Sequence, residues 1–203
     1  MWLFAIITVV AGYLLGNLNG AVCVSHLLGD DVRSHGSGNA GLTNFIRSYG
    51  AGKAALVILI DAGKAVIGCV LGGLLLRTTW GFQTGATLGG AAVMLGHVFP
   101  AFLGFRGGKG ILSGFFIALV TDYRVAIAIL AMFALIYFLT RYVSLGSVVA
   151  AATFGIAFVI LHHQSIVMML CGIFMSALAV FMHRQNILRL IKGEERKTDL
   201  FKK

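Results

Sequence analysis

The hydrophobic positions of this chain form long continuous runs, and the polar positions gather between them. A membrane-spanning helix needs about 20 mostly apolar residues. One of the runs, residues 111–120, is too short for this, so we expect a tilted short helix continued by its flanks or a re-entrant piece buried in protein. The pattern predicts an all-α integral membrane protein of about seven transmembrane helices. These segments are residues 2–28, 54–76, 85–102, 111–120, 125–139, 145–161 and 166–182.

Composition agrees with a membrane location. Of the 203 residues, 59% are hydrophobic and 11% are charged, whereas a soluble domain carries about 25% charged residues. The length suits one membrane-embedded domain, residues 1–203. A net charge of +9 could indicate a nucleic-acid partner in a soluble protein. In a membrane protein, basic residues mark cytoplasmic loops and face anionic lipid head groups, so no nucleic acid is predicted.

The distribution of Lys and Arg predicts the orientation. If all seven segments cross and the N-terminus is outside, the cytoplasmic loops and the tail 183–203 contain 13 of the 16 basic residues. This asymmetry follows the positive-inside rule. The same orientation places three polar segments, residues 34–47, 96–110 and 183–195, on the cytoplasmic face. The C-terminus is therefore also predicted to be cytoplasmic.

Residues 34–47, SHGSGNAGLTNFIR, carry groups suited to anion binding. Gly38 and Gly41 can adopt positive φ, which lets backbone N–H groups converge on an anion. Arg47 can bind phosphate in a bidentate manner. The structural alternative is a polar loop that caps a helix through Thr43 or Asn44. The short polar donors of this segment are Ser37, Asn39, Thr43 and Asn44.

Residues 96–110, GHVFPAFLGFRGGKG, end in a glycine-rich basic loop. It is not a P-loop, because that motif needs glycine where Leu103 stands and Ser or Thr where Gly110 stands, so no nucleotide is predicted. Lys109 supplies a charge, and the next helix would direct its positive end here. The alternative is a flexible cytoplasmic loop. The glycines expected to expose backbone amides are Gly107, Gly108 and Gly110.

Residues 183–195, HRQNILRLIKGEE, place His183 and Asn186 on one helix face. The alternative is an amphipathic interfacial helix with a basic face. Ser144, in RYVSLGS, either faces the site or caps the following helix. The three cysteines lie in apolar segments without a CxxC spacing, so they are read as buried hydrophobes and no metal site is predicted.

Two charged residues, Asp61 and Lys64, lie three positions apart inside the second apolar segment. Ionisable groups at such depth need partners. We expect them to pair with each other, or Asp61 to orient Lys109 or Arg47.

Together these motifs resemble the bacterial membrane glycerol-3-phosphate acyltransferases that use acyl phosphate as donor, the PlsY type. The family patterns GSGNxGATN…R, GHxFPxFxxFxGGKG, RYxSL and HxxNIxRLxxGxE are similar to segments of this chain. Two departures are visible: Leu42 replaces the alanine of GATN, and GNLN at residues 16–19 replaces a Ser-Ile-Pro-like break. The similar segments are residues 36–47, 96–110, 141–145 and 183–195.

The resemblance implies a seven-helix enzyme of the bacterial plasma (inner) membrane, with its active site on the cytoplasmic face. It would move a long-chain acyl group from acyl phosphate to the sn-1 hydroxyl of glycerol 3-phosphate. The products would be lysophosphatidic acid and inorganic phosphate, in the first acylation step of phospholipid synthesis. Acyl phosphate is an activated mixed anhydride, so no cofactor, nucleotide or metal is required. The acyl chain would lie between helices, among membrane lipids.

The residues suggest a mechanism for this reaction. Lys109 with nearby backbone amides would hold one phosphate, and other donors would hold the second and position the hydroxyl. Either His183 or a substrate phosphate oxygen would take the proton. Direct attack is favoured, because the chain offers no Ser–His–Asp array. The donors for the second phosphate are Arg47, Ser37, His183 and Asn186, with Arg189 and Glu195 in support.

Two alternatives remain open from the sequence. His26 and Asp31 fit the H-x4-D spacing of acyltransferases that use thioester donors, in which the aspartate orients a histidine base. An organic-phosphate transporter would need sites reachable from both sides and repeat symmetry. The polar groups lie on one predicted side and no repeat is visible, which disfavours transport.

Overall fold

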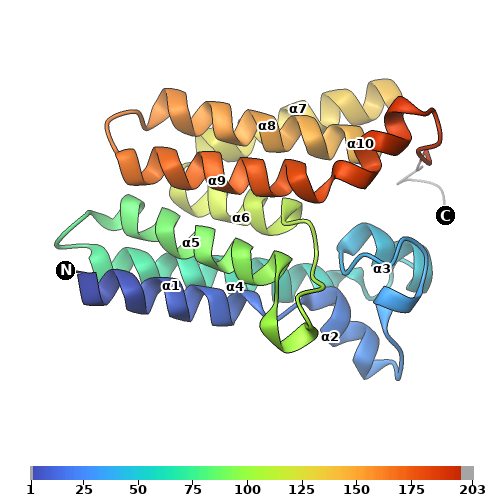
Figure 1. Ribbon diagram of the computed structural model, residues 1–203, viewed down its shortest axis with the longest axis horizontal. Helices are drawn as coiled ribbons and strands as arrows, with labels where there is room; N and C mark the ends of the chain where they lie inside the picture. The colour runs from blue at the N-terminus through green and yellow to red at the C-terminus, as the bar shows by residue number, and fades with distance from the viewer. Residues whose placement is uncertain (1, 198–203) are drawn as a thin grey trace. The chain divides into compact units, whose positions relative to one another are not determined.

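The computed structural model of the chain describes residues 2–197. Met1 and residues 198–203, the end of the expected cytoplasmic tail, lie outside the described residues. Helices account for all regular secondary structure of residues 2–197, which confirms the predicted all-α class. They form two compact units, Met1–Thr121 (unit 1) and Asp122–Lys203 (unit 2), coloured blue to green and yellow to red in Figure 1.

Unit 1 is a group of long helices with short elements at one end (Figure 1). Helices α1 (Trp2–Gly16), α4 (Ala54–Leu76) and α5 (Phe82–Val98) pack against one another, and α6 (Ile111–Thr121) packs on α4 and α5. The short elements carry the first polar segment and the turn that precedes the glycine-rich loop. These elements are α2 (Gly20–Leu27), η1 (Val32–Ser34), α3 (Leu42–Tyr49) and η2 (Ala101–Leu103).

The first apolar segment is broken, which corrects the continuous segment expected over residues 2–28. Helix α1 ends at Gly16 and α2 begins at Gly20. A break inside a membrane exposes peptide groups that need partners. Asn19 caps α2 by accepting from the N–H of Val22 at 3.0 Å. Asn17 donates to the Tyr13 carbonyl at 2.7 Å and accepts from the N–H of Phe102 at 3.1 Å, so the break is stabilised by its own amide side chains.

Close packing of α4 and α5 depends on facing glycines. A Cβ added to Gly72 would overlap the carbonyl oxygen of Gly85 and lie 2.8 Å from Cγ2 of Thr8. Without a hydrophobic driving force between helices in lipid, small residues that let backbones approach give the packing energy. The abundance of glycine in the apolar segments therefore reflects helix packing as well as loop geometry.

The outward faces of the long helices are apolar. On α4, Leu59, Ile67 and Leu74 are 68%, 56% and 58% exposed. They recur at intervals of seven or eight residues, which places them on one helix face. Large apolar side chains exposed along one face of a long helix indicate contact with lipid.

Unit 2 contains the C-terminal helices. Helices α7 (Tyr123–Thr140) and α9 (Ile166–Met182) each pack on α8 (Val143–Leu161), and the short helix α10 (Arg184–Ile191) packs on α8 and α9. The pair α9 and α10 bends by 54° at the junction occupied by His183. The third polar segment therefore begins at a sharp change in chain direction.

The number of membrane crossings differs from the expected seven. Among residues 2–197, five helical stretches are long and apolar enough to cross a bilayer, or six if the bent pair α9–α10 is one span. Helix α6 has 11 residues, which at about 1.5 Å per residue reach only about half of the 30 Å hydrocarbon core. Seven crossings are therefore not confirmed. The five stretches are Trp2–Leu27, Ala54–Leu76, Phe82–Leu103, Tyr123–Thr140 and Val143–Leu161.

Two glycines of α4 provide a matched test of this packing. Gly72→Ala would force its Cβ against the Gly85 backbone, and we expect a loss of about 1–3 kcal/mol. Gly63→Ala meets nothing within 4 Å, so the better helix propensity of alanine should leave stability unchanged or raise it by up to about 1 kcal/mol. Thermal unfolding in detergent measures both. Equal melting temperatures for the two variants would contradict the packing role of Gly72.

Candidate active site

The loop between α2 and α3 is organised around Asn44. The Asn44 side-chain amide donates to the carbonyls of Val32 and His35, both at 3.0 Å, and its oxygen accepts from the N–H of Ser37 at 2.9 Å. Asn44 is only 2% exposed. The residue predicted to bind phosphate therefore holds the loop in shape. It does not cap the helix either, because α3 begins at Leu42 after the N-cap Gly41.

The backbone of this loop differs from the expected arrangement, in which the N–H groups at Gly38 and Gly41 converge on an anion. Gly38 adopts the predicted left-handed conformation with φ +69°, but Gly41 is extended, with φ −139°. The N–H of Gly38 donates to the His35 carbonyl and that of Gly41 to the Asn39 carbonyl, both at 2.9 Å. The expectation that both glycines turn their amides to an anion is therefore corrected, because loop carbonyls already accept from them.

The side chains of the first segment are its candidate anion-binding groups. Ser37 and Arg47 are exposed, and Asn39 and Thr43 are half-buried. Thr43 and Arg47 lie four residues apart on α3, so they share a helix face. Their arrangement fits a surface that presents a hydroxyl and a guanidinium together.

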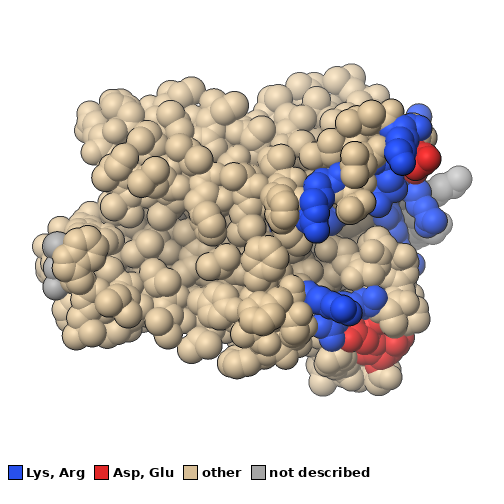
Figure 2. Space-filling model, in the orientation of Figure 1, with Lys and Arg blue, Asp and Glu red and all other residues tan. Residues whose placement is uncertain are grey.

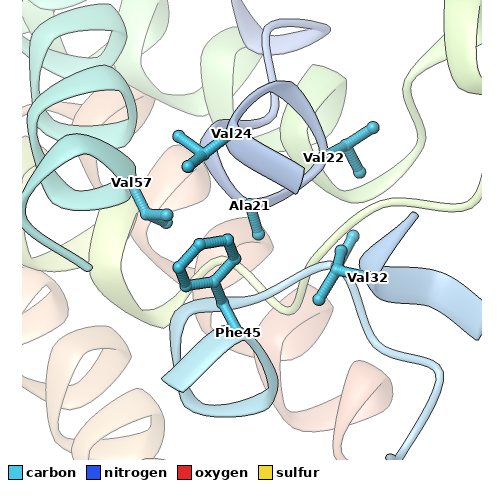
Figure 3. Packing of buried hydrophobic residues seen from close by; sticks show 7 residues of the cluster. Ala21, Val22, Val24, Val32, Phe45 and Val57 are labelled. Carbon is cyan, nitrogen blue, oxygen red and sulfur yellow. The ribbon is translucent and has the colours of Figure 1, made fainter. Parts of the chain in front are cut away.

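A hydrophobic cluster fastens this loop to the membrane helices. In Figure 3 the ring of Phe45, from α3, lies between Ala21 of α2 and Val57 of α4. Leu103, from the second polar segment, packs against the same cluster. Burial of these groups sets the position of α3, and with it the position of Arg47. The buried members are Ala21, Val22, Val24, Val32, Ala40, Phe45 and Val57.

The glycine-rich loop is docked on the end of α5. The N–H of Gly107 donates to the Val98 carbonyl at 3.2 Å and that of Gly108 to the His97 carbonyl at 3.1 Å. The prediction that these glycines expose free amides is therefore corrected at both positions. Gly110 has φ +82° and directly precedes α6, as expected. Lys109, between Gly108 and Gly110, is half-buried.

The structure brings the first two polar segments together. A Cβ on Gly108 would lie 2.9 Å from the carbonyl oxygen of Ala40, so the two loops are in contact at these residues. Asn19 donates to the same carbonyl at 3.0 Å. Arg33 donates to the Leu103 carbonyl at 2.9 Å. The sequence did not predict that Asn19 or Arg33 positions a loop, although the polar amide of Asn19 inside an apolar run was a visible signal.

The alternative pair His26 and Asp31 does approach within 3.5 Å. Asp31 is however bound by Arg33, with Nη2 at 2.7 Å and Nε at 3.0 and 3.1 Å from its carboxylate oxygens. These hydrogen bonds hold the pKa of Asp31 well below its usual range. The carboxylate is therefore committed to Arg33, which weakens its predicted alternative role of orienting His26.

The third polar segment forms a clamp within unit 2. Glu195 accepts from Nδ2 of Asn186 and from Nε of Arg189, both at 2.7 Å. Burial alone would raise the pKa of Glu195, but the hydrogen bonds from Asn186 and Arg189 outweigh it, and the pKa is lowered. The Ser144 hydroxyl also favours the charged form, although its geometry falls outside that of a hydrogen bond. Glu195 thus fixes the side chains of Asn186 and Arg189.

The ring of His183 has a defined tautomer. His183 is 3% exposed, and its Nδ1 lies 2.8 Å from the carbonyl oxygen of Ala179. A carbonyl only accepts hydrogen bonds, so Nδ1 carries the hydrogen and Nε2 of the neutral ring is an acceptor. The neutral ring can therefore take a proton at Nε2.

Charge is concentrated at one end of each unit. In Figure 2 the visible Lys and Arg side chains of unit 1 gather at the end that carries α2 and α3, and those of unit 2 gather beside α10. Among residues 2–197, no group of three or more His, Cys, Asp or Glu side chains could hold a metal ion. The chemistry offered by the described residues is that of cationic and hydroxyl groups on glycine-rich loops.

Apolar helices with basic, glycine-containing loops at one end define an integral membrane protein with a candidate site for anionic small molecules. A family model described as glycerol-3-phosphate acyltransferase matches residues 6–193. The chain therefore belongs to the glycerol-3-phosphate acyltransferase family, and it is a multi-pass membrane acyltransferase.

Relatives and solved structures agree with this assignment. The glycerol-3-phosphate acyltransferase of Thermoanaerobacter sp. (strain X514) is 36% identical over 196 residues, 96% of each chain. That of Caulobacter vibrioides is 39% identical over 195 residues, 94% of this chain and 86% of the relative. The crystal structure of PlsY in its glycerol 3-phosphate form has a TM-score of 0.86, with 32% identity over 98% of this chain and 99% of that chain. Its lysophosphatidic acid form has a TM-score of 0.82 and 31% identity, over 96% and 95%.

Glu195 and its neighbour Glu194 allow a matched test of the clamp. Glu195→Gln removes the charge that Asn186 and Arg189 share, whereas Glu194 is exposed. Hydrogen bonds to a charged group contribute about 1–2 kcal/mol at a partly exposed site. We expect hydrogen exchange of α10 to rise about 5–30-fold in Glu195→Gln and to stay at the wild-type rate in Glu194→Gln.

The same clamp should respond to acid. The pKa of Glu195 is lowered in the folded protein, so its stabilising contribution is present above its ordinary pKa of about 4.3 and is lost as the pH falls through the folded value. Protection of α10 in the wild type should be constant from pH 7 to about 5 and decline below about 4. An identical acid decline in Glu195→Gln would contradict this role.

Proposed function

We propose that this chain transfers a fatty acyl group from acyl phosphate to the sn-1 hydroxyl of glycerol 3-phosphate, yielding lysophosphatidic acid and inorganic phosphate. The observation that carries the proposal is the contact of the two glycine-rich loops at Ala40 and Gly108. Lys109 directly follows Gly108, and the helix α3, which contains Arg47, begins two residues after Ala40. The PlsY structures, described as a glycerol 3-phosphate form and a lysophosphatidic acid form, support the choice of acceptor and product.

The choice of donor follows from the chemistry of the site. Acyl phosphate is an activated mixed anhydride, and its leaving group is inorganic phosphate. The hydroxyl oxygen of the acceptor bonds to the acyl carbon, the bond from that carbon to the phosphate oxygen breaks, and the hydroxyl proton ends on the released phosphate. Two phosphate-bearing substrates account for two loops with cationic groups. Fixed donors stabilise the charge that develops in such a reaction.

In unit 1 the anion-binding groups are side chains. Arg47 and Thr43 share a face of α3, and Ser37 is exposed in the loop before it. Lys109 stands between two glycines that are fixed against α5 and α6. Arginine suits bidentate binding of phosphate and lysine serves as a point charge. We assign Arg47 with Ser37 to one phosphate and Lys109 to the other, with Thr43 and Asn39 as further donors.

In unit 2, His183 and Asn186 contact a substrate phosphate or the acceptor hydroxyl. Glu195 holds the Asn186 amide at 2.7 Å, which fixes its orientation. The Nε2 acceptor of neutral His183 orients the hydroxyl by accepting its hydrogen bond. A phosphate oxygen then receives the proton, so the attack is direct and no acyl-enzyme forms.

The orientation of the chain follows from its charges. We propose a bacterial inner-membrane protein with the N-terminus outside and the basic ends of both units on the cytoplasmic side. Helix α6 is then a seventh, short crossing continued by its flanks. The acyl chain of the donor lies in the lipid phase between helices, which explains why this reaction takes place in a membrane protein.

The first test is phosphate release by purified protein given acyl phosphate and glycerol 3-phosphate without metal or nucleotide. We expect release that needs both substrates and yields lysophosphatidic acid. Lys109→Ala should lower the rate at least about 100-fold, because a fixed cation at the reacting phosphate is removed. His26→Ala should remain active. Turnover only with acyl-CoA, abolished in His26→Ala, would replace this donor with a thioester, and no turnover with either donor would favour transport.

A second test concerns the proton acceptor. With substrate phosphate as acceptor, His183→Ala should raise KM and retain kcat within about tenfold. A general base contributes about 10²- to 10⁴-fold, so a kcat loss of that size would make His183 the base. Mass spectrometry of protein trapped with acyl phosphate should find no acylated serine. A stable acyl group on Ser37 or Ser144 would rule out direct attack.

A further inference from the structure

A buried charged cluster lies beneath the two glycine-rich loops of unit 1. Asp61 and Lys64 of α4 and His97 of α5 are 1%, 3% and 4% exposed. Nζ of Lys64 lies 2.8 Å from Oδ1 of Asp61, which confirms that these two residues pair as predicted. Oδ1 of Asp61 also accepts from the N–H of Gly20, at the start of α2, at 3.1 Å. The cluster is therefore tied to the break in the first span.

Lys64 also donates hydrogen bonds to carbonyl groups that the break leaves without helical partners. Its ammonium donates to the Leu18 carbonyl at 2.5 Å and lies 3.4 Å from that of Gly16. Its remaining neighbour is Nδ1 of His97, at 2.7 Å. The carboxylate and carbonyl oxygens around Nζ are all acceptors, and an ammonium has only hydrogens to donate. Nδ1 of His97 must therefore accept.

This contact defines the tautomer of His97. A positively charged ring 2.7 Å from an ammonium would be strongly repelled in a low-dielectric interior. A neutral imidazole carries one hydrogen, and Nδ1 uses its lone pair for Lys64. The hydrogen of His97 is therefore on Nε2, the ring atom on the opposite side from the cluster.

Nε2 of His97 is the ring atom that meets the glycine-rich loop. A Cβ on Gly108 would overlap Nε2 and lie 2.8 Å from Cε1 of the same ring. The N–H of Gly108 in turn donates to the His97 carbonyl at 3.1 Å. The backbone and the ring of one residue thus support the residue next to Lys109.

We propose that Lys64 and His97 are positioning residues for acyl transfer: Lys64 holds His97 as the Nε2–H tautomer against Gly108, and the ring sets the position of the loop that carries Lys109. The part that concerns acyl transfer rests on the function proposed above. Neither residue contacts substrate. A glycine is required at position 108 because any side chain there would occupy the volume of the His97 ring.

The test compares two replacements of His97 in the full-length protein in detergent. His97→Asn ends near the position of Nδ1 and leaves Gly108 without its ring contact, whereas His97→Gln carries an N–H donor close to the position of Nε2. Hydrogen exchange at the amides of Gly107 and Gly108 should rise about tenfold in His97→Asn and by less in His97→Gln. Equal exchange in the wild type and both variants would overturn the proposal.

Gly90→Ala controls for general loss of stability. A Cβ on Gly90 would lie 2.6 Å from Cγ2 of Ile117 and 2.9 Å from Sγ of Cys69, so it disturbs the packing of α5 without a contact at the loop. At an equal drop in Tm, loop exchange should rise more in His97→Asn than in Gly90→Ala. An equal rise would reduce His97 to a stability role and overturn the proposal.

Kinetics supply the second readout. His97→Asn and Gly108→Ala should each raise the KM of one phosphate substrate about tenfold with a smaller change in kcat, as expected when a binding group is displaced, and Gly90→Ala should leave KM unchanged. Gly108→Ala disturbs the same contact from the loop side and retains the side chains of Asp61, Lys64 and His97, so it decides the case if His97→Asn does not fold. Unchanged KM values in both would overturn the proposal. An inactive wild type would defeat the proposed function, and the exchange measurements would still decide whether His97 positions the loop.

Discussion

The break between α1 and α2 is the constraint on which the rest of unit 1 depends. Peptide groups that lose their helical partners inside a membrane have no water to replace them. In this chain the side chains of Asn17 and Lys64 donate to carbonyls at or beside the break, and the side-chain oxygen of Asn19 accepts from the N–H of Val22. Asp61 in turn neutralises Lys64 and accepts from the first N–H of α2. A buried lysine is thus stable at this depth because every neighbour is an acceptor.

The same groups connect the break to the functional loops. Asn17 holds the turn η2 through the N–H of Phe102, and Asn19 holds the first loop through the Ala40 carbonyl. His97 links the buried charges to Gly108. The two loops are therefore positioned by a shared set of buried polar contacts, supplemented by the hydrophobic cluster around Phe45. Because the amides of Gly107 and Gly108 donate to carbonyls at the end of α5, the side chains of the loops are the candidate anion-binding groups.

In unit 2, the side chains of His183 and Asn186 are held by different contacts. The bend between α9 and α10 puts His183 at the junction, where the Ala179 carbonyl defines its tautomer. Glu195 then closes back on α10 through Asn186 and Arg189. A carboxylate whose pKa is lowered by these contacts keeps its charge throughout the physiological range, so the amide of Asn186 has a constant orientation.

The sequence by itself determined the class and the family of this protein. Continuous apolar runs predicted helices, and the bounds of α4 and α9 agree with the predicted segments, because length and hydropathy alone determine such elements. The long motifs around Ser37, Lys109 and His183 identified the acyltransferase family. The roles of individual residues were less predictable. Asn44 was expected to bind phosphate, and the structure shows that its side chain donates to carbonyls of its own loop. Gly41 was expected to turn and is extended.

Only the tertiary structure decided how the loops of unit 1 are held. Lys64 contacts Leu18 and His97, which are 46 and 33 positions away from it in the sequence. Asn19 contacts Ala40, which is 21 positions away. A hydropathy pattern records which residues leave water, but not which distant carbonyl a buried donor reaches. The contact of His97 with Gly108 depends on the approach of a loop to a helix end, and that approach is determined by close packing in three dimensions.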